Sequence, residues 1–163
     1  MANLLKRILV DIKTSYGSFS EPDWSFLRTM KNTYQALIND LNQNESISSF
    51  FSIQDVSGYM GSGYVPMLNL VHDNQRWSLW LTFVGRYAYF SKNLEGRNYK
   101  VISHNEDCDI PEEIEILAIL KNHAIIPLTK QIVHLQVPEF KMREYISDPI
   151  EIPTIRDILF FET

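Results

Sequence analysis

The chain has 163 residues, of which 45% are hydrophobic and 21% are charged, and its formal net charge is −5 at neutral pH. These proportions are typical of one globular domain, so we expect residues 1–163 to fold as a single unit. The negative balance argues against non-specific attraction to nucleic acid or to anionic membranes. Cys108 is the only cysteine, which excludes an intrachain disulfide and favours a reducing compartment.

Apolar residues at helical spacing predict a first helix that ends near Tyr16 and Gly17. The spacing is formed by Leu4, Leu5, Ile8, Leu9 and Ile12. Lys6 and Arg7 interrupt this apolar run, so the segment does not resemble a secretion signal. No stretch of the sequence is long and apolar enough to predict a membrane span. We therefore expect a cytoplasmic protein.

A second helix is predicted to begin at Ser20, whose hydroxyl can cap a backbone N–H, with Asp23 at the reciprocal capping position. Its apolar face is formed by Leu27, Met30, Tyr34, Leu37 and Leu41. The polar residues 42–44 are predicted to end this helix.

Residues 49–104 change to strand-like segments that are separated by short, turn-rich loops. The predicted strands are Phe50–Ile53, Tyr64–Val71, Trp77–Phe90 and Tyr99–Ile102. Loops this short cannot hold crossover helices, so we expect an antiparallel β-meander of about four strands. The glycine-rich stretch 58–63 is predicted to be a flexible connection, because its spacing matches no phosphate-binding motif. Residues 77–84 carry large apolar side chains on both faces, which predicts a central strand that is covered on both sides.

The last third returns to helical patterns. Asp109 is predicted to cap a helix that has Pro111 in its first turn and an apolar stripe after it. A short helix is predicted over 129–135, and Thr154 is predicted to open a final helical turn. The predicted fold is therefore α+β, with N-terminal helices, a central antiparallel meander and C-terminal helices packed on the sheet.

Catalytic chemistry has little support in the sequence. Cys108 lies among Glu106, Asp107 and Asp109, whose charges are expected to raise the pKa of its thiol and suppress the reactive thiolate. The four histidines show no metal-ligand spacing, so we expect no metal and no cofactor. His72 and His104 both follow strands and could supply a general base, which keeps a small hydrolase-like enzyme with a dispersed histidine and carboxylate site as an alternative.

A nucleic-acid-binding module is a further alternative. The strand Tyr87–Phe90 is aromatic, and exposed aromatic rings on a sheet can stack on bases. The cations near it in sequence are Arg76, Arg86, Lys92, Arg97 and Lys100. The acidic net charge opposes this function, so we expect nucleic acid not to be the partner.

The densest charge in the chain is a stretch of six carboxylates without an intervening cation. They are Glu106, Asp107, Asp109, Glu112, Glu113 and Glu115. Two acids suffice to cap a helix, and a surplus favours encounter with a basic protein. The stretch taken alone favours an ordinary solvated helix start, and its surplus of acids predicts, as the alternative, a partner-binding surface formed by these six residues. Reversal of Glu112 and Glu113 to lysine is expected to weaken that association and to leave the fold intact.

A family resemblance points in the same direction. The order of N-terminal helices, an aromatic meander and a helical tail ending in Thr154-Ile155-Arg156-Asp157-Ile158-Leu159-Phe160-Phe161 resembles small bacterial immunity proteins. These proteins accompany polymorphic toxins or the toxins of contact-dependent growth inhibition. The resemblance implies a cytoplasmic inhibitor without enzymatic activity that covers the active site of a cognate toxin, often a basic nuclease. The acidic stretch would then face the cationic groove of that toxin.

Overall fold

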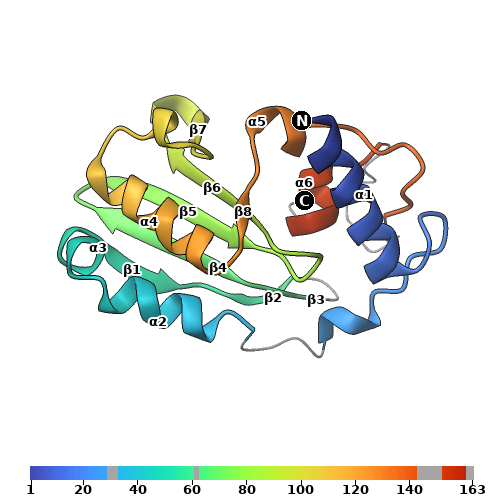
Figure 1. The fold of residues 1–163 in the computed structure, drawn as a ribbon, viewed down its shortest axis with the longest axis horizontal. Coiled ribbons are helices and arrows are strands. Elements are labelled where there is room, and N and C mark those ends of the chain that lie inside the picture. Colours follow the sequence, from blue (N-terminus) through green and yellow to red (C-terminus); the bar gives the residue numbers. More distant parts are fainter. Residues whose placement is uncertain (29–32, 61–62, 143–151, 161–163) are drawn as a thin grey trace.

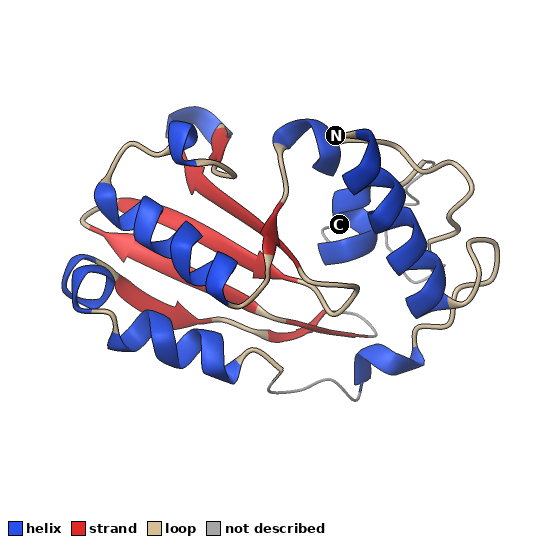
Figure 2. Cartoon of the chain, in the orientation of Figure 1, coloured by secondary structure: helices blue, strands red, loops and turns tan. Residues whose placement is uncertain are grey.

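The computed structural model describes residues 1–28, 33–60, 63–142 and 152–160. The fold is α+β, as predicted: an antiparallel sheet carries helices on one face and at one end (Figure 1). Figure 2 shows the strands together in one sheet, with α4 crossing it and with α1 and α6 at its right-hand end in this view. Within the described residues, no helix combines the length and the apolar composition that a bilayer crossing requires.

The first helix forms as the spacing predicts. α1 spans Ala2–Tyr16 and buries Ile8, Ile12 and Tyr16. Gly17 follows with a positive φ of 73°, a conformation that glycine adopts at helix ends without strain. The Tyr16 hydroxyl donates a hydrogen bond to the carbonyl oxygen of Ile158 in α6 (Ile155–Phe160), at 3.0 Å. This contact joins the first and last helices.

The prediction of a helix beginning at Ser20 is wrong. The backbone N–H of Asp23 donates to the Tyr16 carbonyl at 2.8 Å, which folds the chain back against α1 and prevents a regular helix here. The Asp23 carboxylate instead accepts from the backbone N–H of Ser25, where the short 3₁₀ helix η1 (Ser25–Arg28) begins. Residues 29–32, including Met30, lie outside the described residues.

The last part of the predicted helix forms as α2, and a further short helix, α3, follows it. α2 spans Gln35–Gln43 and buries Leu37 and Leu41, so its predicted end is confirmed. α3 spans Glu45–Phe50 and begins where the Asn44 side chain accepts a hydrogen bond from the Ile47 backbone N–H at 3.0 Å. Phe50 was predicted to start a strand, and this cap places it in a helix.

The main sheet has the strand order β1-β4-β5-β6-β7 with antiparallel pairing, as predicted for a meander. Its strands are β1 (Ser52–Asp55), β4 (Met67–His72), β5 (Gln75–Leu81), β6 (Tyr87–Asn93) and β7 (Tyr99–Val101). An additional short strand, β8 (Ile126–Pro127), pairs in parallel with β6. β8 occupies the same edge of β6 as β7, because Ala88 pairs with Leu81 of β5 on its other edge.

Several strand boundaries differ from the predictions. The predicted strand 77–90 is two strands, β5 and β6, joined by a turn in which Gly85 has φ 68°. The predicted connection 58–63 contributes to a hairpin of β2 (Gly58–Met60) and β3 (Gly63–Val65), while residues 61–62 lie outside the described residues.

The strand that is buried on both faces is β6. Every β6 residue from Tyr87 to Lys92 is buried. In β5, Trp77, Leu79 and Leu81 are buried, whereas the residues between them are only half-buried. The predicted strand with two covered faces is therefore β6 and not β5. Trp80 is apolar, but the face of β5 on which it lies is partly open to solvent, and residue type alone does not indicate this.

The C-terminal helices are close to their predicted positions. α4 spans Pro111–Asn122 and crosses one face of the sheet before the chain returns to β6 as β8 (Figure 1). α5 spans Lys130–Val133. α6 begins after Thr154, whose hydroxyl accepts from the Asp157 backbone N–H at 3.3 Å, as predicted for a cap. Residues 143–151 and Phe161, the last residue of the family-like tail, lie outside the described residues.

Candidate partner-binding surface

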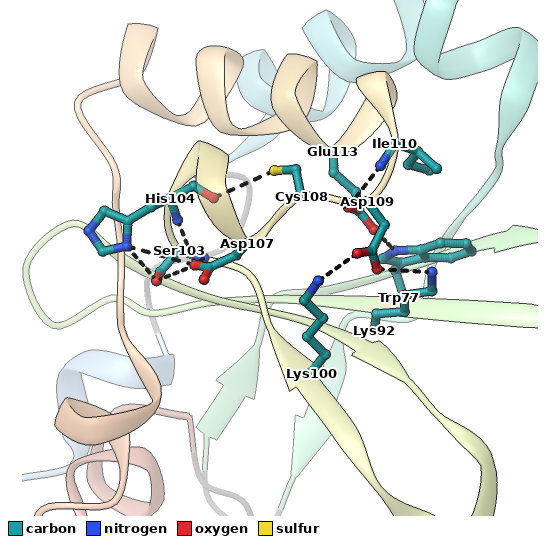
Figure 3. Close-up of polar contacts among 10 residues, drawn as sticks. All are labelled: Trp77, Lys92, Lys100, Ser103, His104, Asp107, Cys108, Asp109, Ile110 and Glu113. Atoms are coloured by element: carbon teal, nitrogen blue, oxygen red, sulfur yellow. Dashed lines mark hydrogen bonds and ion pairs between the residues drawn. The ribbon is translucent and has the colours of Figure 1, made fainter.

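Glu113 is buried, which contradicts its predicted place on an exposed acidic surface. Its side chain has no exposed area and lies beneath the start of α4 (Figure 3). Its carboxylate accepts hydrogen bonds from Trp77 Nε1 at 2.7 Å and from the backbone N–H groups of Asp109 and Ile110 at 2.6 and 3.4 Å. Glu113 therefore binds the helix start to the central sheet. The sequence predicts Asp109 as the cap of this helix, but the cap residue is Ile110.

Asp109 forms a second link between the helix start and the sheet. Its carboxylate lies 2.7 Å from Nζ of Lys100 and 3.5 Å from Nζ of Lys92 (Figure 3). The hydrogen bond from Lys100 holds the pKa of Asp109 below its usual value, and the same bond raises the pKa of Lys100. Lys92 is buried, and its ammonium lies 5.0 Å from the centroid of the Trp77 ring. Asp109 remains exposed, but its charge is paired with Lys92 and Lys100 of the same chain.

Asp107 organises the loop that precedes α4. One of its oxygens accepts from the backbone N–H groups of Ser103 and His104 and from the Ser103 hydroxyl, each at 2.9 Å. Burial alone would raise the pKa of Asp107, but these hydrogen bonds outweigh it and lower the pKa below its usual value. Because the Ser103 proton goes to the carboxylate, the Ser103 oxygen accepts from Nδ1 of His104 at 2.9 Å. Asp107 and His104 therefore stabilise this loop.

Cys108 has the raised pKa that the sequence predicts, although the cause differs. Burial is the largest contribution and raises the pKa of the thiol to about 11, with the carboxylates of Glu113 and Asp107 adding to the rise. The Sγ atom lies 3.6 Å from the carbonyl oxygen of His104, to which it donates. A thiol with this pKa is almost entirely protonated at neutral pH.

We expect the alkylation of Cys108 by iodoacetamide to be slow at pH 8 and to accelerate until the pH approaches 11. The fraction of thiolate at pH 8 is about 100-fold lower than for a thiol of ordinary pKa. Mass spectrometry of the native protein over a pH series measures the rate, and the urea-unfolded chain is the control. A rate that levels off near pH 9 in the native protein would contradict this expectation.

Three carboxylates of the acidic stretch lie at the surface without a partner among the described residues. Glu106 and Glu115 are exposed, and Glu112 is half-buried. Among the described residues, these three side chains have no hydrogen bond or ion pair. We name Glu106, Glu112 and Glu115 the acidic surface. It is smaller than predicted, because Glu113, Asp107 and Asp109 are committed to internal contacts.

A groove lies along the other side of α4. Its volume is about 430 Å³. It is lined by Ser103, His104, Asn105, Ile114, Leu117, Ala118, Lys121, Ile125, Ile126 and Pro127. Leu117 and Ile125 are buried and form its floor, whereas Ile114 is 41% exposed. We name this the α4 groove. No pattern in the sequence predicted it, because it forms where α4 passes the end of β7 and the start of β8.

The two histidines of the enzyme alternative have separate surroundings. The His72 ring stacks on Phe50, with centroids 3.7 Å apart, and its Nδ1 lies 2.8 Å from the Phe50 carbonyl oxygen. His104 contacts Ser103 and Asp107 instead. His72 ends β4 and His104 follows β7, and these strands are three spacings apart, or roughly 14 Å. Among the described residues, no three histidine, cysteine or acidic side chains could together hold a metal ion.

The aromatic side chains of β6 are not exposed. Tyr87 and Phe90 have no exposed area, and Tyr89 is buried as well. These rings therefore cannot stack on nucleic-acid bases, which removes the structural basis of the nucleic-acid alternative.

Comparison of the chain with protein-family models, curated proteins and solved structures yields no match.

Proposed function

We propose that this protein is an immunity-type inhibitor that binds and neutralises a basic toxin protein, with a nuclease as the expected class of toxin. The acidic surface, formed by Glu106, Glu112 and Glu115, makes the first contact with the toxin. The chain itself performs no chemistry in this proposal. Its cellular location is the cytoplasm, where such a toxin would act.

One observation supports this proposal above the others. Among the described residues, the six carboxylates of the stretch form ion pairs with two ammonium groups, those of Lys92 and Lys100, which leaves four negative charges in excess. Glu106, Glu112 and Glu115 carry three of these charges, at a helix start whose N–H groups are already satisfied by internal hydrogen bonds. Their charge is not needed for capping, and a field of this kind accelerates encounter with a cationic protein.

The test compares two variants of equal charge. In the first, Glu106, Glu112 and Glu115 are replaced by lysine; in the second, the exposed residues Glu21, Glu95 and Glu139 are replaced by lysine. Each variant changes the net charge from −5 to +1. Immobilised wild-type protein is used to capture a basic polypeptide from the native host, and stopped-flow mixing then measures its association rate. We expect the first variant to associate about tenfold more slowly at low salt, and the second to stay within about twofold of wild type.

Neutralisation is tested separately by producing the captured polypeptide in a bacterial host with and without this protein. The proposal requires that growth stops without it and is restored with it. Circular dichroism establishes that both triple variants remain folded. Equal loss of association in the two variants would show that only net charge matters, and a captured partner that is acidic would refute the proposal.

A further inference from the structure

The α4 groove carries polar side chains that the fold does not use. Within the described part of the chain, neither the Lys121 ammonium nor the Asn105 amide has a hydrogen bond or an ion pair to another side chain. Both residues are exposed, and both line the groove. In the same protein, Lys92 and Lys100 are each paired with Asp109. Lys121 is thus a cation beside an apolar groove, and none of the described carboxylates forms an ion pair with it.

The remaining lining is apolar. Leu117 and Ile125 form the floor, and Ile114, Ile126 and Pro127 are only partly covered. Such side chains gain free energy when a hydrocarbon group displaces water from them, by roughly 25 cal/mol for each Å² that is buried. The volume of about 430 Å³ lies within the range of roughly 300–1,000 Å³ that is usual for small-molecule sites.

The carboxylates nearest in sequence do not cancel the charge of Lys121. Asp107 is held by Ser103 and His104 on the loop. Glu115 lies about 120° from Lys121 around the helix, given 100° per residue, whereas Ile114, Ala118 and Lys121 share one side. The groove therefore joins an apolar surface to the Lys121 ammonium and the Asn105 amide, beside Ser103 and His104, and no described carboxylate pairs with Lys121.

We propose that the α4 groove binds a small organic anion that has a hydrocarbon body and a single carboxylate. The hydrocarbon lies on Ile114, Ile126 and Pro127, above the buried Leu117 and Ile125. The carboxylate accepts hydrogen bonds from the Lys121 ammonium and the Asn105 amide. This site does not use the acidic surface, so it stands or falls independently of the toxin-binding function.

Three probes separate the parts of this proposal. Octanoate has both the hydrocarbon chain and the carboxylate; octanol has the chain alone; acetate has the carboxylate alone. Titration calorimetry and ¹H–¹⁵N chemical-shift mapping measure affinity and position. We expect octanoate to bind most tightly, with the largest shifts at the backbone amides of Leu117, Ala118 and Lys121. Octanol is expected to bind at the same place about fivefold more weakly, and acetate not measurably.

Variants then assign the contacts. Lys121→Gln is expected to weaken octanoate about fivefold and to leave octanol unchanged, because it removes only the charge. Ala118→Phe, at an exposed helix position, fills the groove and is expected to abolish binding of both. Lys13→Gln, an exposed lysine of α1, is the matched control and is expected to change nothing. Equal affinity for octanol and octanoate, shifts outside the groove, or no octanoate binding by the folded protein would each overturn the proposal.

Discussion

Replacement of Glu113 by alanine is expected to lower the free energy of unfolding by about 4 kcal/mol. The substitution removes the acceptor for Trp77 Nε1 and for the backbone N–H groups of Asp109 and Ile110. A buried donor that loses its partner costs about 1–3 kcal/mol, and three donors are affected here. Because small domains are stable by only about 5–15 kcal/mol, this loss is a large part of the total.

Urea denaturation followed by circular dichroism measures this effect, with Glu115→Ala as the control. Glu115 lies on the same helix and is exposed, so its replacement is expected to change stability by no more than about 0.5 kcal/mol. Similar unfolding midpoints for the two variants would mean that the buried carboxylate contributes nothing to the fold. The sequence predicts that Glu113→Lys leaves the fold intact, but the structure leads us to expect that it destabilises the fold, because an ammonium here would face the Trp77 N–H and two backbone N–H groups.

Replacement of Gly85 by alanine is expected to destabilise the protein by about 3 kcal/mol. Gly85 has φ 68°, and an added Cβ would lie 2.5 Å from the Tyr87 ring and 2.8 Å from the Asp11 carboxylate. Tyr87 is fully buried and donates its hydroxyl hydrogen bond to Asp11 of α1. The methyl group therefore cannot be placed unless the buried Tyr87 ring and the Asp11 carboxylate shift, which disturbs their hydrogen bond.

Gly17→Ala separates the two causes of this loss. Gly17 has a similar φ of 73°, but no atom lies within 4 Å of the position of its added Cβ. Its replacement is expected to cost only the backbone strain of about 1–2 kcal/mol. Thermal or urea unfolding of both variants measures the difference. If Gly85→Ala is no more harmful than Gly17→Ala, the contact with Tyr87 and Asp11 is not restrictive.

Local patterns predicted the elements whose stability is local. α1 was found because its apolar side chains repeat over four turns, and Gly17 marked its end. The antiparallel order of β4, β5 and β6 followed from loops too short for any other connection. The start of the second helix failed because a hydrogen bond between Asp23 and Tyr16 overrides the local capping signal.

The burial and the partners of the carboxylates in the acidic stretch could be predicted from the sequence only in part. Glu113 shares the face of α4 with Ile116, Leu117 and Leu120, at spacings of three, four and seven, so helical phase alone could have predicted its burial. Its partner could not have been predicted, because Trp77 lies 36 residues away on another element. β8 was missed because two residues carry no strand pattern, and only the edge of β6 defines them.

The course of the chain around α4 has a mechanical consequence. The segment leaves the sheet after β7, crosses as α4 and returns as β8 to the same edge of β6. The helix α4 is therefore connected to β6 at both of its ends, through β7 and through β8. In addition, Glu113 and Asp109 bind the start of α4 to Trp77, Lys92 and Lys100. A force that a bound molecule applies to α4 is therefore expected to be transmitted to β6 and to its neighbour β5.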